Sequence, residues 1–167
     1  ETIISMGRFP HLSRLQQLDQ NDLEIVEKAL HITQTTHLKN RPISQLSSGE
    51  RQRVLIARTI AQQTPFLMLD EPNTHLDIKH QISIFRLLQE LNKNHNMSIV
   101  IVLHDLTAAA TFSQTVALLD RGELLTIGLP QEVITSENIK TVYGVNVEIY
   151  PSLSGEFPQV NYLQIDS

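Results

Sequence analysis

The sequence contains no cysteine and no tryptophan, and aromatic residues make up only 5% of its 167 positions. Without cysteine there is neither a disulfide framework nor a thiolate metal site, which suits a reducing cytoplasm. Scarce aromatic rings and a net charge of −5 argue against nucleic acid as a partner, because its binders usually present stacking rings and a basic face. No apolar run approaches the roughly 20 residues of a membrane span. The 41% apolar and 19% charged residues instead fit a globular domain with a core.

A phosphate-binding loop of the pattern G-x-x-x-x-G-K-S/T is also missing. None of the glycines is followed by lysine; they are Gly7, Gly49, Gly122, Gly128, Gly144 and Gly155. The seven histidines lack the H-E-x-x-H spacing, which argues against zinc. The chain begins with Glu1 rather than methionine and shows no signal-peptide pattern, so we expect a piece of a longer protein.

Strands and helices alternate in the larger, later part of the sequence. "PFLMLDEP" and "MSIVIVLHD" are short apolar runs typical of strands buried on both faces. Helices are predicted over residues 78–92 and 106–114, and "TVALLDRGELLTIG" predicts two strands about an Arg121–Gly122 turn. The tail from residue 143 predicts further short strands. This order favours an α/β fold, a parallel sheet flanked by helices.

The first part of the chain reads as helical and rather polar. Asn21 or Asp22 is the expected cap of a helix that carries Leu23, Val26 and Leu30 at helical spacing. We therefore expect a helical subdomain over residues 1–63, and the α/β part, with the terminal strands, over residues 64–167.

The stretch "PISQLSSGERQR" places two serines and a glycine at the start of a predicted helix. Ser47 and Glu50 have the spacing of a capping box, in which each side chain accepts a hydrogen bond from the other's backbone N–H. Taken alone, such a loop is most often only a helix cap. The free N–H groups of a helix N-terminus, the hydroxyls of Ser47 and Ser48 and the small Gly49 also favour an anion, such as a phosphate.

Ionisable residues follow both apolar strands. Asp70 and Glu71 end the first strand, and His104 follows the second. Ligands of open α/β sheets bind at the carboxyl ends of the strands. A nucleotide hydrolase needs one carboxylate near Mg²⁺ and another near the attacking water, and a histidine could reach the γ-phosphate. A plain strand end followed by a turn is the alternative reading.

In this order and spacing the motifs resemble those of the ATP-binding subunits of ATP-binding-cassette (ABC) transporters, a P-loop NTPase fold. "LSSGE" resembles the signature loop, "FLMLDE" the Walker B strand, "NTHLD" the D-loop and "VLHD" the switch-histidine loop. "MGRFPH", "EPNTHLDIKHQ" and "YGVNVEIYPSLSGEFPQV" are similar to the importers of ferric siderophores, haem and cobalamin. The resemblance runs through essentially the whole chain.

The resemblance implies roles for the residues at the strand ends. Asp70 would hold the Mg²⁺ shell, and Glu71 would polarise the hydrolytic water. His104 would contact the γ-phosphate, and Asp77 would make the D-loop contact across a dimer of ATPase subunits.

The resemblance also assigns the signature loop to a partner. Ser47 and Gly49 would donate to the γ-phosphate of ATP held by the second ATPase subunit of a homodimer. Ser48 stands where the family usually has glycine, and Glu50 where glutamine is commonest.

The implied parent is a peripheral protein on the cytoplasmic face of the inner membrane that uses ATP and Mg²⁺. It would work beneath two membrane permeases, which the helical subdomain would meet, and indirectly with an external substrate-binding protein. The family's phosphate loop, adenine-stacking aromatic and Q-loop glutamine all precede the motif "GRFPH". We therefore expect this chain alone to bind ATP poorly and not to hydrolyse it.

Two alternatives stay open. One is a non-catalytic module that docks on a permease or on a complete cassette. The other is an ABC ATPase of translation or DNA repair, although the long inserted arms and basic surfaces usual there are not visible in the sequence.

Overall fold

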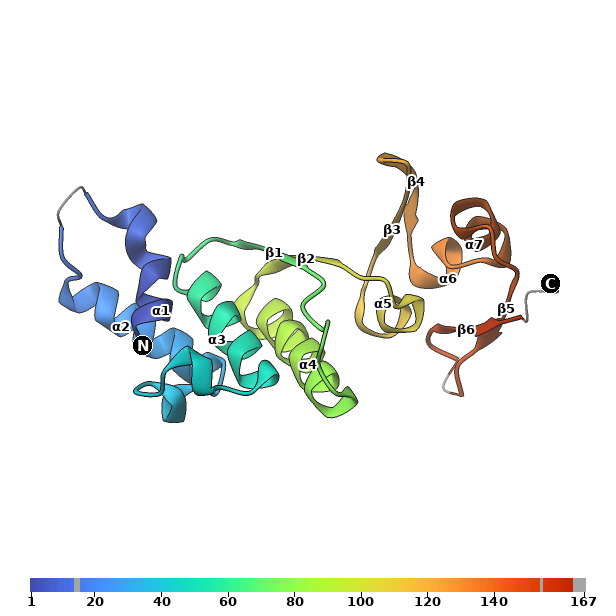
Figure 1. Ribbon diagram of the computed structural model, residues 1–167. Helices are drawn as coiled ribbons and strands as arrows, with labels where there is room; N and C mark the ends of the chain where they lie inside the picture. Colours follow the sequence, from blue (N-terminus) through green and yellow to red (C-terminus); the bar gives the residue numbers. More distant parts are fainter. Residues whose placement is uncertain (14–15, 154, 164–167) are drawn as a thin grey trace. The chain divides into compact units, whose positions relative to one another are not determined.

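A computed structural model describes residues 1–13, 16–153 and 155–163 of the chain. It contains two compact units, residues 1–102 and 103–167, which we describe separately (Figure 1). Among the described residues, no helix is both long enough and apolar enough to cross a membrane.

The first unit begins with helices. They are α1 (Thr2–Ser5), the 3-10 helix η1 (Met6–His11), α2 (Gln20–Ile32), two short 3-10 turns η2 (Thr36–Leu38) and η3 (Ile43–Gln45), and α3 (Ser48–Ile60). Their apolar faces form a core that includes Ile4, Val26, Leu30, Leu38, Val54 and Ala57. The helical reading of this region is confirmed.

The expected cap of α2 was wrong by two or three residues. Asp19 is the N-cap, and its side chain accepts from the backbone N–H of Asp22 at 2.8 Å. Asp22 lies inside the first turn, where its Oδ1 accepts from Nε of Arg8 at 2.8 Å. Both side chains of this ion pair are buried. Because the Asp22 side chain pairs with the buried Arg8, which is distant in sequence, Asp22 lies inside the helix and Asp19 becomes the N-cap.

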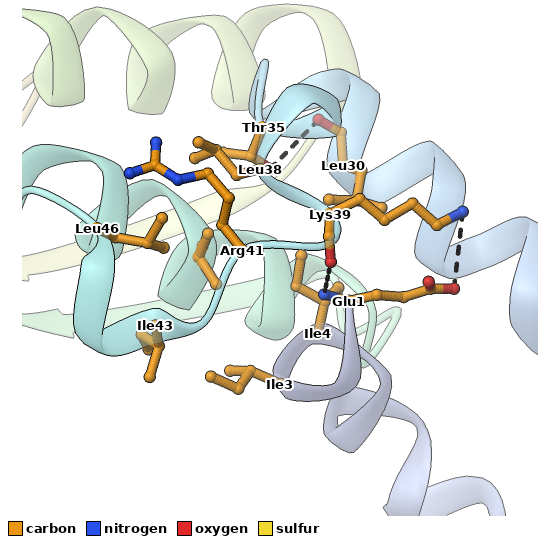
Figure 2. Close-up of a pocket in the computed structure, with 11 residues that line it drawn as sticks. Glu1, Ile3, Ile4, Leu30, Thr35, Leu38, Lys39, Arg41, Ile43 and Leu46 are labelled. Atoms are coloured by element: carbon orange, nitrogen blue, oxygen red, sulfur yellow. Dashed lines mark hydrogen bonds and ion pairs between the residues drawn. The ribbon is translucent and has the colours of Figure 1, made fainter.

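A small cavity of about 20 Å³ lies among the helices of this unit (Figure 2). It is lined mostly by apolar side chains such as Ile4, Leu38 and Leu46. Across its mouth the amino group of Glu1 donates to the carbonyl of Lys39 at 2.8 Å. A volume of this size holds about one water molecule, so it is a packing gap.

The rest of the first unit is a strand–helix–strand segment. Strand β1 (Phe66–Asp70) leads through a loop to α4 (Ile78–His95) and then to β2 (Ser98–Val102). The two strands pair in parallel, from Phe66 opposite Ser98 to Asp70 opposite Val102. This parallel pairing of strands that flank a helix is what the sequence predicted.

Within the described residues of the first unit, only one face of these strands is covered. Leu67 is fully buried, in a core with Ile56 of α3 and Ile84, Leu88 and Leu91 of α4. Met68 and Val102, on the opposite face, are 70% and 51% exposed. Within the first unit the expectation that both faces are buried is therefore wrong, because α3 and α4 pack against the same side.

The second unit has helices α5 (Leu106–Phe112), α6 (Pro130–Val133) and α7 (Ser136–Tyr143). Its strands form two antiparallel pairs, β3 (Val116–Asp120) with β4 (Glu123–Gly128) and β5 (Val147–Pro151) with β6 (Pro158–Tyr162). Arg121 and Gly122 both have positive φ, 49° and 84°, which confirms the predicted turn. The short terminal strands are confirmed as well.

Candidate functional site

The segment of residues 46–50, which we call the signature loop, runs through Ser47, the N-cap of α3, into the first turn of that helix. Ser47 is extended (φ −60°, ψ 162°), and its Oγ accepts from the backbone N–H of Glu50 at 3.3 Å. In return, Oε2 of Glu50 accepts from the backbone N–H of Ser47 at 2.8 Å. This reciprocal pair confirms the predicted capping box. Since the Ser47 hydroxyl acts as an acceptor here, its own hydrogen can still be donated outward.

Glu50 is held in its ionised form. The hydrogen bond from the backbone N–H of Ser47 lowers the pKa of this carboxyl most, and the charge of Arg41 lowers it further. Arg41 also donates to the carbonyl of Gln45 at 2.8 Å, which ties down the preceding turn. The charge of Glu50 therefore stabilises the loop from within the first helical turn.

Gly49, within the signature loop, is buried against α4. A Cβ atom added to Gly49 would lie 2.2 Å from Cδ2 and 2.8 Å from Cγ of His80, too close for any real contact. His80 stands in the first turn of α4, two residues after that helix begins. Only glycine fits here while the ring keeps its place.

Asp77 caps α4 and also holds His80. Its Oδ1 accepts from the backbone N–H of His80 at 2.8 Å and lies 2.8 Å from Nδ1 of the same residue. These contacts lower the pKa of Asp77, the backbone hydrogen bond most. The Asp77 side chain is still 66% exposed, so it can also meet an outside group.

The carboxylates predicted for Mg²⁺ binding and for catalysis lie at the end of β1. Asp70 is its last residue and is exposed. Glu71 follows with φ of +44°, and its backbone N–H donates to the carbonyl of Val102 at 3.1 Å. Such a conformation costs on the order of 1–3 kcal/mol for a residue other than glycine and is concentrated at functional sites.

The loop after Glu71 fixes its side chain. Thr74 donates from Oγ1 to Oε2 of Glu71 at 3.0 Å, and its backbone N–H donates to the carbonyl of Glu71 at 3.1 Å. Gln81 of α4 donates to the carbonyls of Asn73 and Leu76 at 3.3 and 3.0 Å. Thr74 and Gln81 are thus supports that the sequence reasoning did not identify; both lie within or just after the D-loop motif.

His104 lies two residues past the end of β2, in the second unit. It is exposed, and the next residue, Asp105, caps α5 by accepting from the backbone N–H groups of Thr107 and Ala108 at 2.8 and 3.0 Å. This cap fixes the turn that carries His104.

Within the first unit, the structure brings the signature loop and Asp77 together through His80. Among the described residues, no group of three or more histidine or acidic side chains is arranged to hold a metal ion. Asp70 by itself still fits Mg²⁺, because that ion usually takes one or two protein carboxylates, the other ligands being substrate phosphates and water.

Comparison with known proteins places these features in a family. The model of the family described as ABC transporter matches residues 5–74. The petrobactin import ATP-binding protein FpuC of Bacillus anthracis is 43% identical over 148 residues, which are 89% of this chain and 54% of the relative. Residues 5–74 of this chain therefore carry the ABC transporter domain.

A second relative and a solved structure show the same similarity. The ferric enterobactin transport ATP-binding protein FepC of Escherichia coli K12 is 38% identical over 89% of this chain and 55% of its own length. A chain in the structure of an inward-facing metal-chelate type ABC transporter superposes with a TM-score of 0.88 at 28% identity, over 97% of this chain and 65% of that one. The predicted α/β fold of the P-loop NTPase class is confirmed.

The chain spans about half the length of the curated relatives it matches. A structure of the ATP-binding cassette MJ0796, dimeric and bound to ADP and phosphate, superposes with a TM-score of 0.61 at 26% identity, over 77% of this chain and 56% of that one. The segments that resemble the signature loop, the Walker B strand and the D-loop all lie within this chain.

Proposed function

We propose that this chain is the C-terminal part of the ATPase subunit of an ABC importer. The parent would energise uptake of an iron chelate such as a ferric siderophore, or of haem or cobalamin. The observation that carries the proposal is the capped signature loop, whose Gly49 packs against His80 next to the cap Asp77. The same unit contains a strand that ends in Asp70 and is followed by Glu71. The relatives FpuC and FepC, ATP-binding proteins of petrobactin import and ferric enterobactin transport, support the iron-chelate class.

The roles follow from the chemistry of each group. Glu71 would orient and polarise the attacking water, since Thr74 and its backbone contact hold the carboxylate in place. Asp70 would hold Mg²⁺, which would neutralise phosphate charge when bound. His104 would contact the γ-phosphate from the turn fixed by Asp105.

The signature loop would act on the nucleotide of a second copy of the subunit. Ser47 can donate its hydroxyl hydrogen, and the first backbone N–H groups of α3, including those of Ser48 and Gly49, point from the helix N-terminus. Asp77 keeps an exposed side chain for a contact across the dimer. The permeases, the external binding protein and a location on the cytoplasmic face of the membrane belong to the same proposal, as does a helical subdomain ending near residue 63.

The short chain and its parent should differ in activity. This sequence has no G-x-x-x-x-G-K-S/T loop, so the β-phosphate has no holder of that kind here. We expect the isolated chain to be inert as an ATPase and at most to dock on a complete cassette or permease.

The test compares Mg·ATP hydrolysis by the parent gene product and by the short chain. The parent should turn over ATP, Glu71→Gln should reduce its turnover by at least about a hundredfold, and the short chain should show none. Glu123→Gln, an exposed change in β4, is the matched control and should behave as the parent does. Hydrolysis by the short chain, or full activity of Glu71→Gln, would contradict the proposal.

The transported compound is tested in cells. Uptake of labelled ferric siderophore, haem and cobalamin is compared between cells with and without the gene, and with the Glu71→Gln allele. Loss of uptake of one compound identifies the substrate class. Unchanged uptake of all three favours the alternatives, a docking module or an ABC ATPase of translation or DNA repair.

A further inference from the structure

We propose that His80 is a positioning residue that holds the signature loop and the D-loop cap at a fixed separation, so that both reach the partner's nucleotide together. The inference rests on the proposed function, and it assigns His80 a role in the work of that site. His80 would not touch the nucleotide; it would act through Gly49 and Asp77.

The first contact is steric. The His80 ring fills the space where a side chain at position 49 would stand, with Cδ2 only 2.2 Å and Nε2 3.1 Å from an ideal Cβ. A ring at the end of a side chain can normally rotate away from such a clash. Here, rotation of the His80 ring would also break its contact with Asp77 in the D-loop motif.

The second contact prevents free rotation. Nδ1 of His80 lies 2.8 Å from Oδ1 of Asp77, the same oxygen that accepts the backbone hydrogen bond capping α4. Moving the ring away from Gly49 breaks the ring contact with Asp77. The positions of the signature loop and of Asp77 are therefore linked through a single side chain.

One helical turn further on, a second attachment joins the same two helices, which run side by side in Figure 1. Arg53 of α3 donates to Oγ of Ser83 of α4 at 2.5 Å and to the carbonyl of Thr33 at 2.9 Å. Residues 49 and 53 lie on one face of α3, and residues 80 and 83 on one face of α4. Two successive attachments keep the helix N-termini from sliding past one another.

The expected kinetic signature separates positioning from general stability. In the family's dimer each subunit holds ATP on its own phosphate loop, while its signature loop and D-loop serve the partner's ATP. Loss of His80 should therefore lower kcat, and also nucleotide-driven dimerisation, while leaving the KM for ATP within about twofold.

The experiment is a double-mutant cycle on the full-length subunit assembled with its permeases. Gly49→Ala should reduce kcat roughly tenfold or more in the wild-type background, because the methyl group displaces the ring. In the His80→Ala background the same change should cost less than about threefold, since the methyl group then has space. His80→Asn, which keeps a side-chain donor for Asp77, should retain more activity than His80→Ala.

Lys79→Ala is the matched control, because Lys79 is exposed in the same turn of α4. It should leave kcat within about twofold of wild type. Circular dichroism of each variant identifies any loss through unfolding, in which case His80→Asn alone decides between positioning and packing.

The outcomes are distinct. If Gly49→Ala is equally harmful with and without His80, or if His80→Ala keeps full kcat, the positioning role is overturned while the proposed function stands. If the wild-type assembly does not hydrolyse ATP, the proposed function fails, and this inference fails with it.

Discussion

Met68 and Val100 are direct partners across the parallel β1–β2 pair, and both side chains are exposed, by 70% and 44%. Phe66, on the same face, is 47% exposed. Parallel strands are normally covered on both faces. This apolar face, made by Phe66, Met68, Val100 and Val102, is therefore a surface that further protein would cover.

Neighbouring residues of β1 should respond differently to truncation. Leu67→Ala should destabilise the protein by about 2–5 kcal/mol, because it opens a cavity in the α3–α4 core. Met68→Ala should be within about 0.5 kcal/mol of neutral in the short chain. Denaturant unfolding measures both differences.

The same two variants in the parent protein show whether additional chain buries the exposed face of β1 and β2. There Met68→Ala should cost about 2 kcal/mol or more, if the additional chain buries this face. Equal, small effects of Met68→Ala in both proteins would mean that the face stays open to solvent in the parent.

The exposed face should also make the short chain self-associate at high concentration. Val100→Lys places a charge at the centre of the face and should shift the sedimentation profile towards monomer. Lys substitution at Gln20, an exposed polar position in α2, is the control and should leave association unchanged. A strictly monomeric wild-type chain would contradict this prediction.

The signature loop should lose order when its cap is removed. Ser47→Ala removes the acceptor for the backbone N–H of Glu50 and should destabilise the protein by about 1 kcal/mol. Ser48→Ala, one residue later and already inside α3, should cost less. Equal effects of the two changes on the free energy of unfolding would show that the cap does not stabilise the loop.

The Asp22 carboxyl should make stability depend on pH. The hydrogen bond from Arg8, with that from the Asp19 backbone, lowers the pKa of Asp22 in the folded protein. Because the folded pKa is lowered, the stabilisation is complete above the usual aspartate pKa, about 3.9, and is lost as pH falls through the lower folded value.

Asp22→Asn should therefore lower the melting temperature at pH 7 by several degrees, and the difference should shrink as the pH falls below about 4. Glu24→Gln, exposed on the same helix, should show no comparable loss. A melting-temperature difference that is the same at pH 3 and pH 7 would assign the effect of Asp22→Asn to packing.

Some parts of the structure could be predicted because their causes are local. The capping box of Ser47 and Glu50 lies within four residues, and the Arg121–Gly122 turn needs only two residues with positive φ. The cap of α2 was misplaced because the side chain that draws Asp22 inward is Arg8, 14 residues away. A local sequence pattern cannot predict such a contact.

The residues of the candidate site also divide into those that local pattern predicts and those that depend on contacts with other side chains. Motif order was enough to select Asp70, Glu71, Asp77 and the signature loop, since their spacing is a property of the chain itself. Thr74 and Gln81 were missed because hydroxyl and amide side chains in a loop have no distinctive pattern until their partners are known.

Residue types and their spacing were enough to predict the order of strands and helices, the helix cap before α3 and the resemblance of the chain to a family. The need for glycine at position 49 became evident only from the packing of the folded chain. The reason is a contact with His80, 31 positions later, whose ring occupies the place of a side chain. Contacts between residues distant in sequence depend on how helices pack, and packing also decided which face of β1 is buried.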